Sequence, residues 1–260
     1  MEIWQAIVLG AVQGFTEFLP VSSSGHLILL QNYFGIQEGA LFFSIMLHLG
    51  TLIPVVVVLW KQIVEMFKKP FNKLGYLILA TIPAGVVGLA VSFLDLDAFF
   101  ADHIWLLSIT FTLTAIEMLF SEIYCKKKEM ANPINCKTAL VMGGGQMLGV
   151  FPGLSRSGTT ITFGCIGKVK REDNANFAFL MSIPIILAAV LLEGLKCVKA
   201  GTLGNIPALP LVIGIFTAMI CGYVSIKIML SVIKKADYKW FSLYLVLLSI
   251  ANVIVFIARG

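Results

Sequence analysis

Residues 13–26 read Gln-Gly-Phe-Thr-Glu-Phe-Leu-Pro-Val-Ser-Ser-Ser-Gly-His, and residues 152–160 read Pro-Gly-Leu-Ser-Arg-Ser-Gly-Thr-Thr. Each run is a polar break inside a longer apolar stretch, 3–31 for the first and 138–167 for the second. Irregular backbone at membrane depth survives only where it is buried in protein or lines a wet cavity. The sequence therefore predicts two re-entrant hairpins in the interior of a membrane protein.

The composition around these two breaks predicts a helical membrane protein. Of the 260 residues, 58% are hydrophobic and 13% are charged, and the mean hydropathy is +0.94. A soluble chain of this size could not bury so much apolar surface. A helix that crosses a bilayer needs roughly 20 mostly apolar residues. Six stretches meet that requirement: about 39–60, 74–94, 104–124, 175–194, 209–231 and 241–258. The predicted fold class is all-α and polytopic.

The positive charges predict the orientation of the chain. Of the 19 Lys and Arg residues, 14 lie in four connections: 61–73, 125–137, 168–173 and 232–239. The opposite connections 32–38 and 95–103 hold none, and 195–207 holds only Lys196 and Lys199. Basic loops mark the cytoplasmic side, so both termini are expected outside. The positive charges behind the net charge of +5 are thus placed as in a membrane protein. They predict contact with membrane lipids and no nucleic-acid partner.

The two hairpins also predict an internal repeat. A shift of 133 residues places Gly10 on Gly143, Gln13 on Gln146, Ser22 on Ser155, Ser24 on Ser157 and Gly25 on Gly158. Each half, about 1–130 and about 134–260, is then one hairpin followed by three spans, within one membrane domain of residues 1–260. Three is odd, so the halves are inverted, and inverted repeats share a site near the midplane. The alternative is chance matching of Ser and Gly in a biased composition.

The cysteines give no sign of a cross-linked or metal-bound framework. The chain has five, an odd number, and none forms a Cys-x-x-Cys pair. The sequence therefore predicts neither a disulfide framework nor a zinc site. The oligomeric state is left open, and a homodimer is one arrangement that the sequence allows.

The first hairpin offers groups suited to metal binding or proton transfer. Gln13 and Glu17 lie four residues apart on one helix face, and an ionisable group inside a membrane is costly enough to indicate function. His26 follows three serines at a glycine, where it could orient or deprotonate a hydroxyl such as that of Ser23. The plainer alternative for Glu17 is a structural partner of Arg156. His48, inside a span, is interpreted as structural.

The second hairpin carries a cation that needs an anion. Arg156 is the one Lys or Arg in the middle of an otherwise uncharged hairpin. A planar guanidinium matches phosphate oxygens, and a helix that starts after the break would point its positive end at the same anion. Glycines let backbone N–H groups approach closely. The predicted phosphate-binding residues are Gln13, Ser22, Ser24, Gly153, Ser155, Ser157 and Thr160, beside the predicted catalytic residues Glu17, Ser23, His26 and Arg156.

These two segments resemble the signature motifs of the undecaprenyl-diphosphate phosphatases of the BacA/UppP family. The family pattern (E/Q)xxxE is met by Gln13 and Glu17, and the following PVSSSGH run by Pro20 to His26. The second pattern, PGxSRSxxT, is met in full by Pro152, Gly153, Ser155, Arg156, Ser157 and Thr160. Some members carry an acidic residue shortly before an LHLGTL-like stretch; this chain has Ser44 there, so no carboxylate role is assigned at that position.

The resemblance implies hydrolysis of a polyprenyl diphosphate lipid, undecaprenyl diphosphate, to undecaprenyl phosphate and inorganic phosphate. It further implies a site that opens at the outer face of the bacterial cytoplasmic membrane and a divalent cation, Mg²⁺ or Ca²⁺. From the residue types, Glu17, helped by Gln13, is expected to bind this metal or to act as a base. A lipid-phosphate transporter or flippase is the main alternative, because inverted repeats with broken hairpins are also a transporter architecture. An ion channel is a weaker alternative, since the interior offers few ionisable residues in series.

Overall fold

The computed structural model describes residues 1–200 and 207–259, and in that part of the chain every regular element is a helix. Residues 201–206, within the predicted outer connection 195–207, and Gly260 lie outside the described residues. The helices are α1 Ile3–Phe18, α2 Ser23–Tyr33, α3 Ala40–Val58, α4 Trp60–Met66, α5 Asn72–Phe93, α6 Leu96–Asp102, α7 Leu106–Lys127, α8 Cys136–Leu148, α9 Arg156–Ile166, α10 Arg171–Ala200, α11 Ala208–Lys235 and α12 Lys239–Arg259.

Six of the described helices are long and apolar enough to cross a membrane, and they match the six predicted spans. They are α3, α5, α7, α10, α11 and α12. The all-α polytopic prediction is therefore confirmed. α10 begins at Arg171, earlier than the expected residue 175, because Glu172 and Asp173 in its first turn complement the positive end of the helix. Within the connections 61–73 and 95–103, the structure adds the short helices α4 and α6, which the sequence did not predict.

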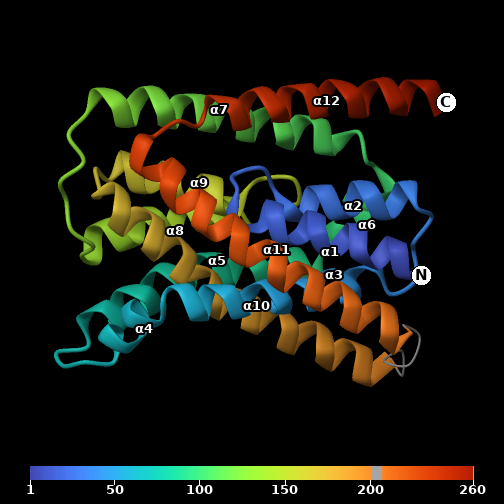
Figure 1. The fold of residues 1–260 in the computed structure, drawn as a ribbon, viewed down its shortest axis with the longest axis horizontal. Coiled ribbons are helices and arrows are strands. Elements are labelled where there is room, and N and C mark those ends of the chain that lie inside the picture. The colour runs from blue at the N-terminus through green and yellow to red at the C-terminus, as the bar shows by residue number, and fades with distance from the viewer. Residues whose placement is uncertain (201–206, 260) are drawn as a thin grey trace.

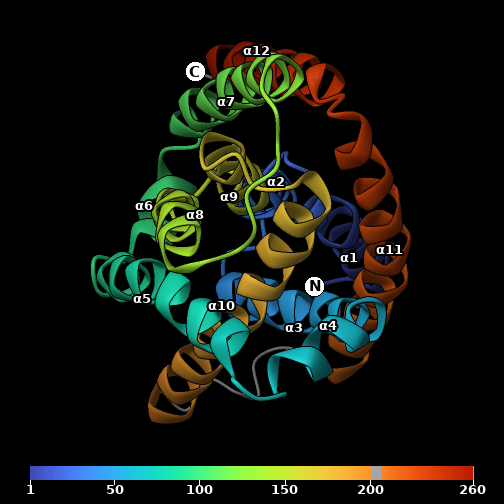
Figure 2. The same ribbon diagram turned by 90° about the vertical axis from the view of Figure 1, so that its left-hand side faces the viewer.

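The two polar breaks form the bends of two helical hairpins. α1 and α2 are joined through residues 19–22, and α8 and α9 through residues 149–155. Figure 1 shows that the two hairpins enter the molecule from opposite ends and that their bends meet near its middle. In the end-on view of Figure 2, α2, α8 and α9 lie inside a ring that includes α5, α7, α11 and α12. The predicted re-entrant hairpins thus occupy the interior.

Small residues let the first hairpin pack closely against a spanning helix. A Cβ added at Gly10 would lie 2.5 Å from the Gly214 carbonyl oxygen, and one at Gly14 would lie 2.7 Å from that of Ala218. α1 and α11 are therefore in backbone contact, as small residues allow between membrane helices. The second hairpin uses the same device, because a Cβ at Gly143 would lie 2.5 Å from the Ala80 carbonyl oxygen of α5. Both hairpins are thereby held rigidly in place.

The cysteine prediction was wrong in one respect. Cys125 at the end of α7 and Cys165 at the end of α9 form a disulfide, with their Cα atoms 5.9 Å apart. The two cysteines are 40 residues apart in sequence and come together only because α7 packs against α9. Sequence spacing could not reveal this pairing.

The chain termini and two of the basic connections lie at opposite ends of the molecule. Both termini lie at one end in Figure 1, while α4 and the connection between α7 and α8 lie at the other. These segments belong to the predicted basic loops 61–73 and 125–137. The inverted relation of the two complete halves, and the division near residue 130, remain predictions.

Candidate active site

Each bend ends in a helix capped by a serine in the same way. The backbone N–H of Gly25 donates to Ser22 Oγ at 3.4 Å at the start of α2, and that of Gly158 donates to Ser155 Oγ at 3.1 Å at the start of α9. A serine at the N-cap satisfies a backbone donor that the helix leaves unpaired. The other free N–H groups of the two first turns make both helix starts favourable for an anion.

The two bends touch each other. Ser157 Oγ donates to the Leu19 carbonyl oxygen at 3.2 Å, which ties the second bend to the first. A Cβ added at Gly25 would lie 2.9 Å from Gly153 Cα, so the two glycines permit the close approach. Gly153 also has φ of +83°, a conformation that favours glycine. The predicted meeting of the two serine-bearing bends is confirmed.

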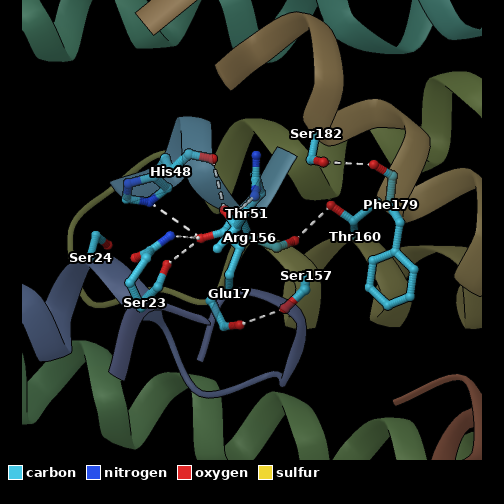
Figure 3. Close-up of polar contacts among 12 residues, drawn as sticks. Glu17, Ser23, Ser24, His48, Thr51, Arg156, Ser157, Thr160, Phe179 and Ser182 are labelled. Carbon is cyan, nitrogen blue, oxygen red and sulfur yellow. Dashed lines mark hydrogen bonds and ion pairs between the residues drawn. The ribbon is translucent and has the colours of Figure 1, made fainter. Parts of the chain in front are cut away.

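Glu17 is the centre of the polar contacts between the hairpins. Its Oε1 accepts from Arg156 Nη2, which joins α1 to α9. Its Oε2 accepts from Gln13 Nε2 at 2.9 Å and from Ser23 Oγ at 2.7 Å. Figure 3 shows Ser23 and His48 pointing toward this carboxylate from two different elements, with Arg156 beside it. Four side chains from four helices therefore converge on one carboxylate.

The cluster has little contact with solvent, so loss of one of its charges is costly for the other. The Glu17 side chain is 1% exposed and that of Arg156 is 18% exposed. Removal of one partner of a buried ion pair leaves an uncompensated charge and costs roughly 3–5 kcal/mol. The structural alternative for Glu17, as partner of Arg156, is thus realised, and the same pair places a cation and a carboxylate next to the Ser23 hydroxyl.

His48, interpreted from the sequence as structural, contacts this cluster. Its Nε2 lies 3.3 Å from Glu17 Oε2, and its Nδ1 donates to the Ser44 carbonyl oxygen at 2.7 Å. Because a carbonyl can only accept, Nδ1 carries a proton, and the contact with Glu17 is attractive when Nε2 carries one too. A sequence signal existed: Ser44, His48 and Thr51 form a polar stripe at helical spacing along an apolar span.

His26 is not brought to Ser23. Its Nδ1 lies 2.7 Å from the Ser22 carbonyl oxygen, and its Nε2 lies 2.7 Å from the Tyr244 hydroxyl of α12. Both ring nitrogens are therefore engaged elsewhere, and Ser23 donates to Glu17 instead. The hydrogen bonds do not support His26 as the direct proton partner of Ser23.

The other predicted site residues line the same two bends. Ser24 Oγ lies 3.5 Å from Ser22 Oγ, and Ser157 Oγ lies 3.2 Å from Ser155 Oγ. Thr160 Oγ1 donates to the Arg156 carbonyl oxygen at 2.7 Å and so stabilises the first turn of α9. Both bends therefore carry clusters of hydroxyl groups, of which Ser23 contacts Glu17 directly.

A metal at the predicted position would depend on the substrate for most of its ligands. Among the described residues, no group of three or more His, Cys, Asp or Glu side chains is placed to hold a metal ion. Gln13 Oε1, however, is buried without a hydrogen-bond partner beside the Glu17 carboxylate. These two oxygens fit the way Mg²⁺ binds, through one or two protein oxygens together with substrate phosphates and water.

Comparison with known proteins decides the family. The family described as bacitracin resistance protein BacA matches residues 6–251. The chain belongs to the BacA family. Both bends and all the converging side chains lie inside the matched range.

Relatives from several bacteria align along almost the whole chain. A protein of Carboxydothermus hydrogenoformans named undecaprenyl-diphosphatase is 38% identical over 262 aligned positions, which cover 100% of this chain and 99% of that protein. Proteins of the same name from Bacteroides fragilis and Moorella thermoacetica are 37% and 36% identical, over 98% and 100% of this chain and the same shares of theirs. The BacA chain is thus similar to these proteins from end to end.

Proposed function

We propose that this BacA chain hydrolyses undecaprenyl diphosphate to undecaprenyl phosphate and inorganic phosphate, and so recycles the lipid carrier for cell-wall synthesis. The observation that carries the proposal is the buried Arg156–Glu17–Ser23 cluster at the meeting of two membrane-embedded bends. A cation, a base and a hydroxyl in one low-dielectric site are what phosphoryl transfer needs. The activity named for the relatives supports the same reaction.

Arg156 binds the terminal phosphate in this proposal. Its guanidinium presents several donors, of which Glu17 occupies one group, Nη2. The remaining donors and the starts of α2 and α9 stabilise the negative charge on the transferred phosphoryl group. Ser22, Ser24 and Ser155 add hydroxyl donors near it, while Ser157, Gly153 and Thr160 hold the shape of the bend.

Glu17 acts as the base for Ser23. The Ser23 hydroxyl already donates to Glu17 Oε2, so the carboxylate takes this proton as Ser23 Oγ attacks the terminal phosphorus. The bond to the bridging oxygen breaks, and the lipid monophosphate leaves. Water then attacks the phosphoserine, the Ser23 oxygen leaves and is reprotonated, and inorganic phosphate is released. In the alternative version, Ser23 and Glu17 activate a water for direct attack; a trapped phosphoserine separates the two.

In this proposal Gln13 Oε1 and the Glu17 carboxylate would hold a divalent cation, Mg²⁺ or Ca²⁺, together with the diphosphate. The cation would supply positive charge that neutralises the phosphate oxygens. Chelation with EDTA is expected to lower phosphate release, and added Mg²⁺ or Ca²⁺ to restore it. Full activity in the presence of the chelator would remove the cation from the proposal.

The protein lies in the bacterial cytoplasmic membrane, with the site open to the outer face and both termini outside. The gathering of the basic connections away from the termini supports this orientation. The proposal also allows a homodimer. The cluster is complete within one chain, so the reaction does not depend on a second copy. When a tag is placed at the C-terminus of the protein, protease added to intact cells is expected to cleave it. Protection of the tag until the cells are lysed would show the opposite orientation.

The test of the function is phosphate release by the purified protein in detergent micelles from undecaprenyl diphosphate. Hydrolysis needs no second compartment, so phosphate is expected to accumulate in micelles. A transporter or flippase that uses the same site would release none. Wild-type protein that inserts and folds but releases no phosphate would therefore refute the proposal.

A further inference from the structure

Tyr244 is a contact of the candidate site that neither motif predicts. Its hydroxyl lies 2.7 Å from His26 Nε2. The Ser22 carbonyl oxygen, an acceptor only, fixes a proton on His26 Nδ1, so the neutral imidazole presents Nε2 as an acceptor to the Tyr244 O–H. The two rings are parallel within 7°, with centroids 5.7 Å apart. His26 thus points its one adaptable nitrogen at α12.

The His26–Tyr244 pair lies where the buried hairpin meets the membrane-facing side of the protein. His26 is 6% exposed, and Tyr244 is 44% exposed. α12 packs mainly against α7, and its residues Phe241 and Leu248, one turn from Tyr244 on either side, pack with buried residues of α7 and of the first hairpin. The pair is therefore the point at which a polar group of the interior meets a side chain open to lipid.

The pair is also close to the meeting of the two bends. His26 follows Gly25, whose added Cβ would meet both Gly153 of the second bend and the ring of Phe111. The Phe111 ring lies 5.3 Å from the His26 ring, centroid to centroid. The imidazole is thus fixed between Phe111 and Tyr244 in the first turn of α2, where the free N–H groups favour an anion.

A lipid diphosphate has two phosphates with different surroundings. The terminal phosphate is released, whereas the other stays on the lipid and must lie on the side where the isoprenoid chain passes into the bilayer. Glu17 is buried beside Arg156, whereas Tyr244 of the His26–Tyr244 pair is 44% exposed on the membrane-facing side. A phenol O–H is a suitable donor to a phosphate oxygen.

We propose that Tyr244, positioned by His26, forms the subsite for the lipid-proximal phosphate and distinguishes a lipid-linked phosphate from free phosphate. The Tyr244 hydroxyl turns from His26 Nε2 to a phosphate oxygen when the lipid enters, and the His26 ring positions Tyr244 for this contact. This inference rests on the proposed hydrolysis, because it assigns the second phosphate of that substrate.

The test separates the two phosphates with two inhibitors. Farnesyl diphosphate is the substrate for the purified full chain in detergent, farnesyl monophosphate carries only the lipid-proximal phosphate, and inorganic phosphate represents the terminal one. Tyr244→Phe keeps the ring and removes the hydroxyl. The expected result is a rise of about tenfold in KM and in the inhibition constant of farnesyl monophosphate, as for the loss of one hydrogen bond to a charged group. The kcat and inhibition by inorganic phosphate are expected to stay within about twofold.

Tyr33→Phe is the matched control. The Tyr33 hydroxyl donates to Asn252 Oδ1 of α12 at 3.1 Å, so it joins the same two helices at a different position along them. This variant is expected to leave all four constants unchanged. Equal losses in both variants would show that the Tyr244 hydroxyl only holds α12 in place. Unchanged inhibition by farnesyl monophosphate in Tyr244→Phe, or a parallel loss of inhibition by inorganic phosphate, would also overturn the subsite.

The outcome is distinguishable from a failure of the proposed function. If wild-type protein hydrolyses farnesyl diphosphate and Tyr244→Phe behaves like wild type, the subsite is refuted and the hydrolysis stands. If wild-type protein does not hydrolyse it, calorimetric binding of farnesyl monophosphate to wild type and Tyr244→Phe still measures the subsite. Equal affinities of the two proteins refute it in that case as well.

Discussion

The hairpin α1–α2 and the hairpin α8–α9 share the same serine helix cap and carry opposite charges. Each ends in a helix capped by a serine, Ser22 or Ser155, which accepts from a glycine N–H three residues later. The first hairpin carries the carboxylate of Glu17, and the second carries the guanidinium of Arg156. A matched pair of bends therefore supplies the shape, and a difference between them supplies the chemistry.

The bends also reach their sharp turns by different residues. In the first hairpin Ser22 itself has φ of +66°, whereas in the second the positive φ falls on Gly153, and Ser155 has φ of −79°. A non-glycine residue in this region is strained, and such strain persists where surrounding contacts hold it. The first bend, which carries Ser23 and His26, is thus the more constrained of the two.

Loss of the cation in the second hairpin is expected to have the largest effect. Arg156→Ala removes the donor that stabilises charge on the transferred phosphoryl group, and kcat should fall about a thousandfold. Phosphate release from undecaprenyl diphosphate in micelles measures it. Arg171→Ala is the control, since Arg171 binds the backbone carbonyls of Cys125 and Lys234 away from the cluster. Near-normal turnover by Arg156→Ala would end the assignment of the anion site.

Loss of the carboxylate in the first hairpin is expected to come next. Glu17→Gln removes the base for Ser23, and kcat should fall about a hundredfold. The same change leaves Arg156 buried without its counter-charge and should lower the free energy of unfolding by about 3 kcal/mol.

The double variant Glu17→Gln/Arg156→Gln separates these two losses. It removes both buried charges, so thermal unfolding in detergent should recover toward wild type while phosphate release stays absent. Recovery of activity together with stability would mean that the pair acts only as a structural tie between the hairpins.

The sequence predicted those features that depend on local composition. Length and hydropathy alone identify a span, so all six were found, and a run of Pro, Gly and Ser inside an apolar stretch identifies a bend. The meeting of Glu17 and Arg156 could also be predicted, because a buried charge requires a partner and few candidates lie in the interior. This long-range contact could be predicted because an unpaired charge in a membrane is energetically costly.

Features that depend on which helices become neighbours could not be predicted. His48 lies in a span that satisfies hydropathy as a whole, and its contact with Glu17 exists because α3 passes beside α1. Tyr244 reaches His26 from 218 residues away. The pairing of Cys125 with Cys165 likewise follows from the packing of α7 on α9. Each of these contacts is a property of helix packing rather than of a motif.

Loss of His48, which contacts Glu17 from outside both hairpins, is expected to have an intermediate effect on kcat. His48→Gln removes the imidazole that faces Glu17 Oε2, the oxygen that also receives the Ser23 proton, so kcat should fall about tenfold. His103→Gln is the matched control, because His103 is exposed and its Nδ1 contacts only the Phe99 carbonyl oxygen of its own turn among the hydrogen bonds described. Equal rates for the two variants would return His48 to a structural role.

The smallest effect should come from the glutamines at equivalent places in the two hairpins. In the first hairpin Gln13 donates to Glu17. In the second hairpin Gln146 takes the place of Gln13 and Val150 that of Glu17. Both polar side-chain atoms of Gln146 are buried without a partner in the described structure. Replacement of a buried unsatisfied amide by an apolar group of similar volume is neutral or stabilising. Gln146→Leu should therefore leave phosphate release unchanged and raise the free energy of unfolding by about 1 kcal/mol. Gln13→Leu should lower both, and a stability loss of equal size in the two variants would mean that Gln146 has a polar partner after all.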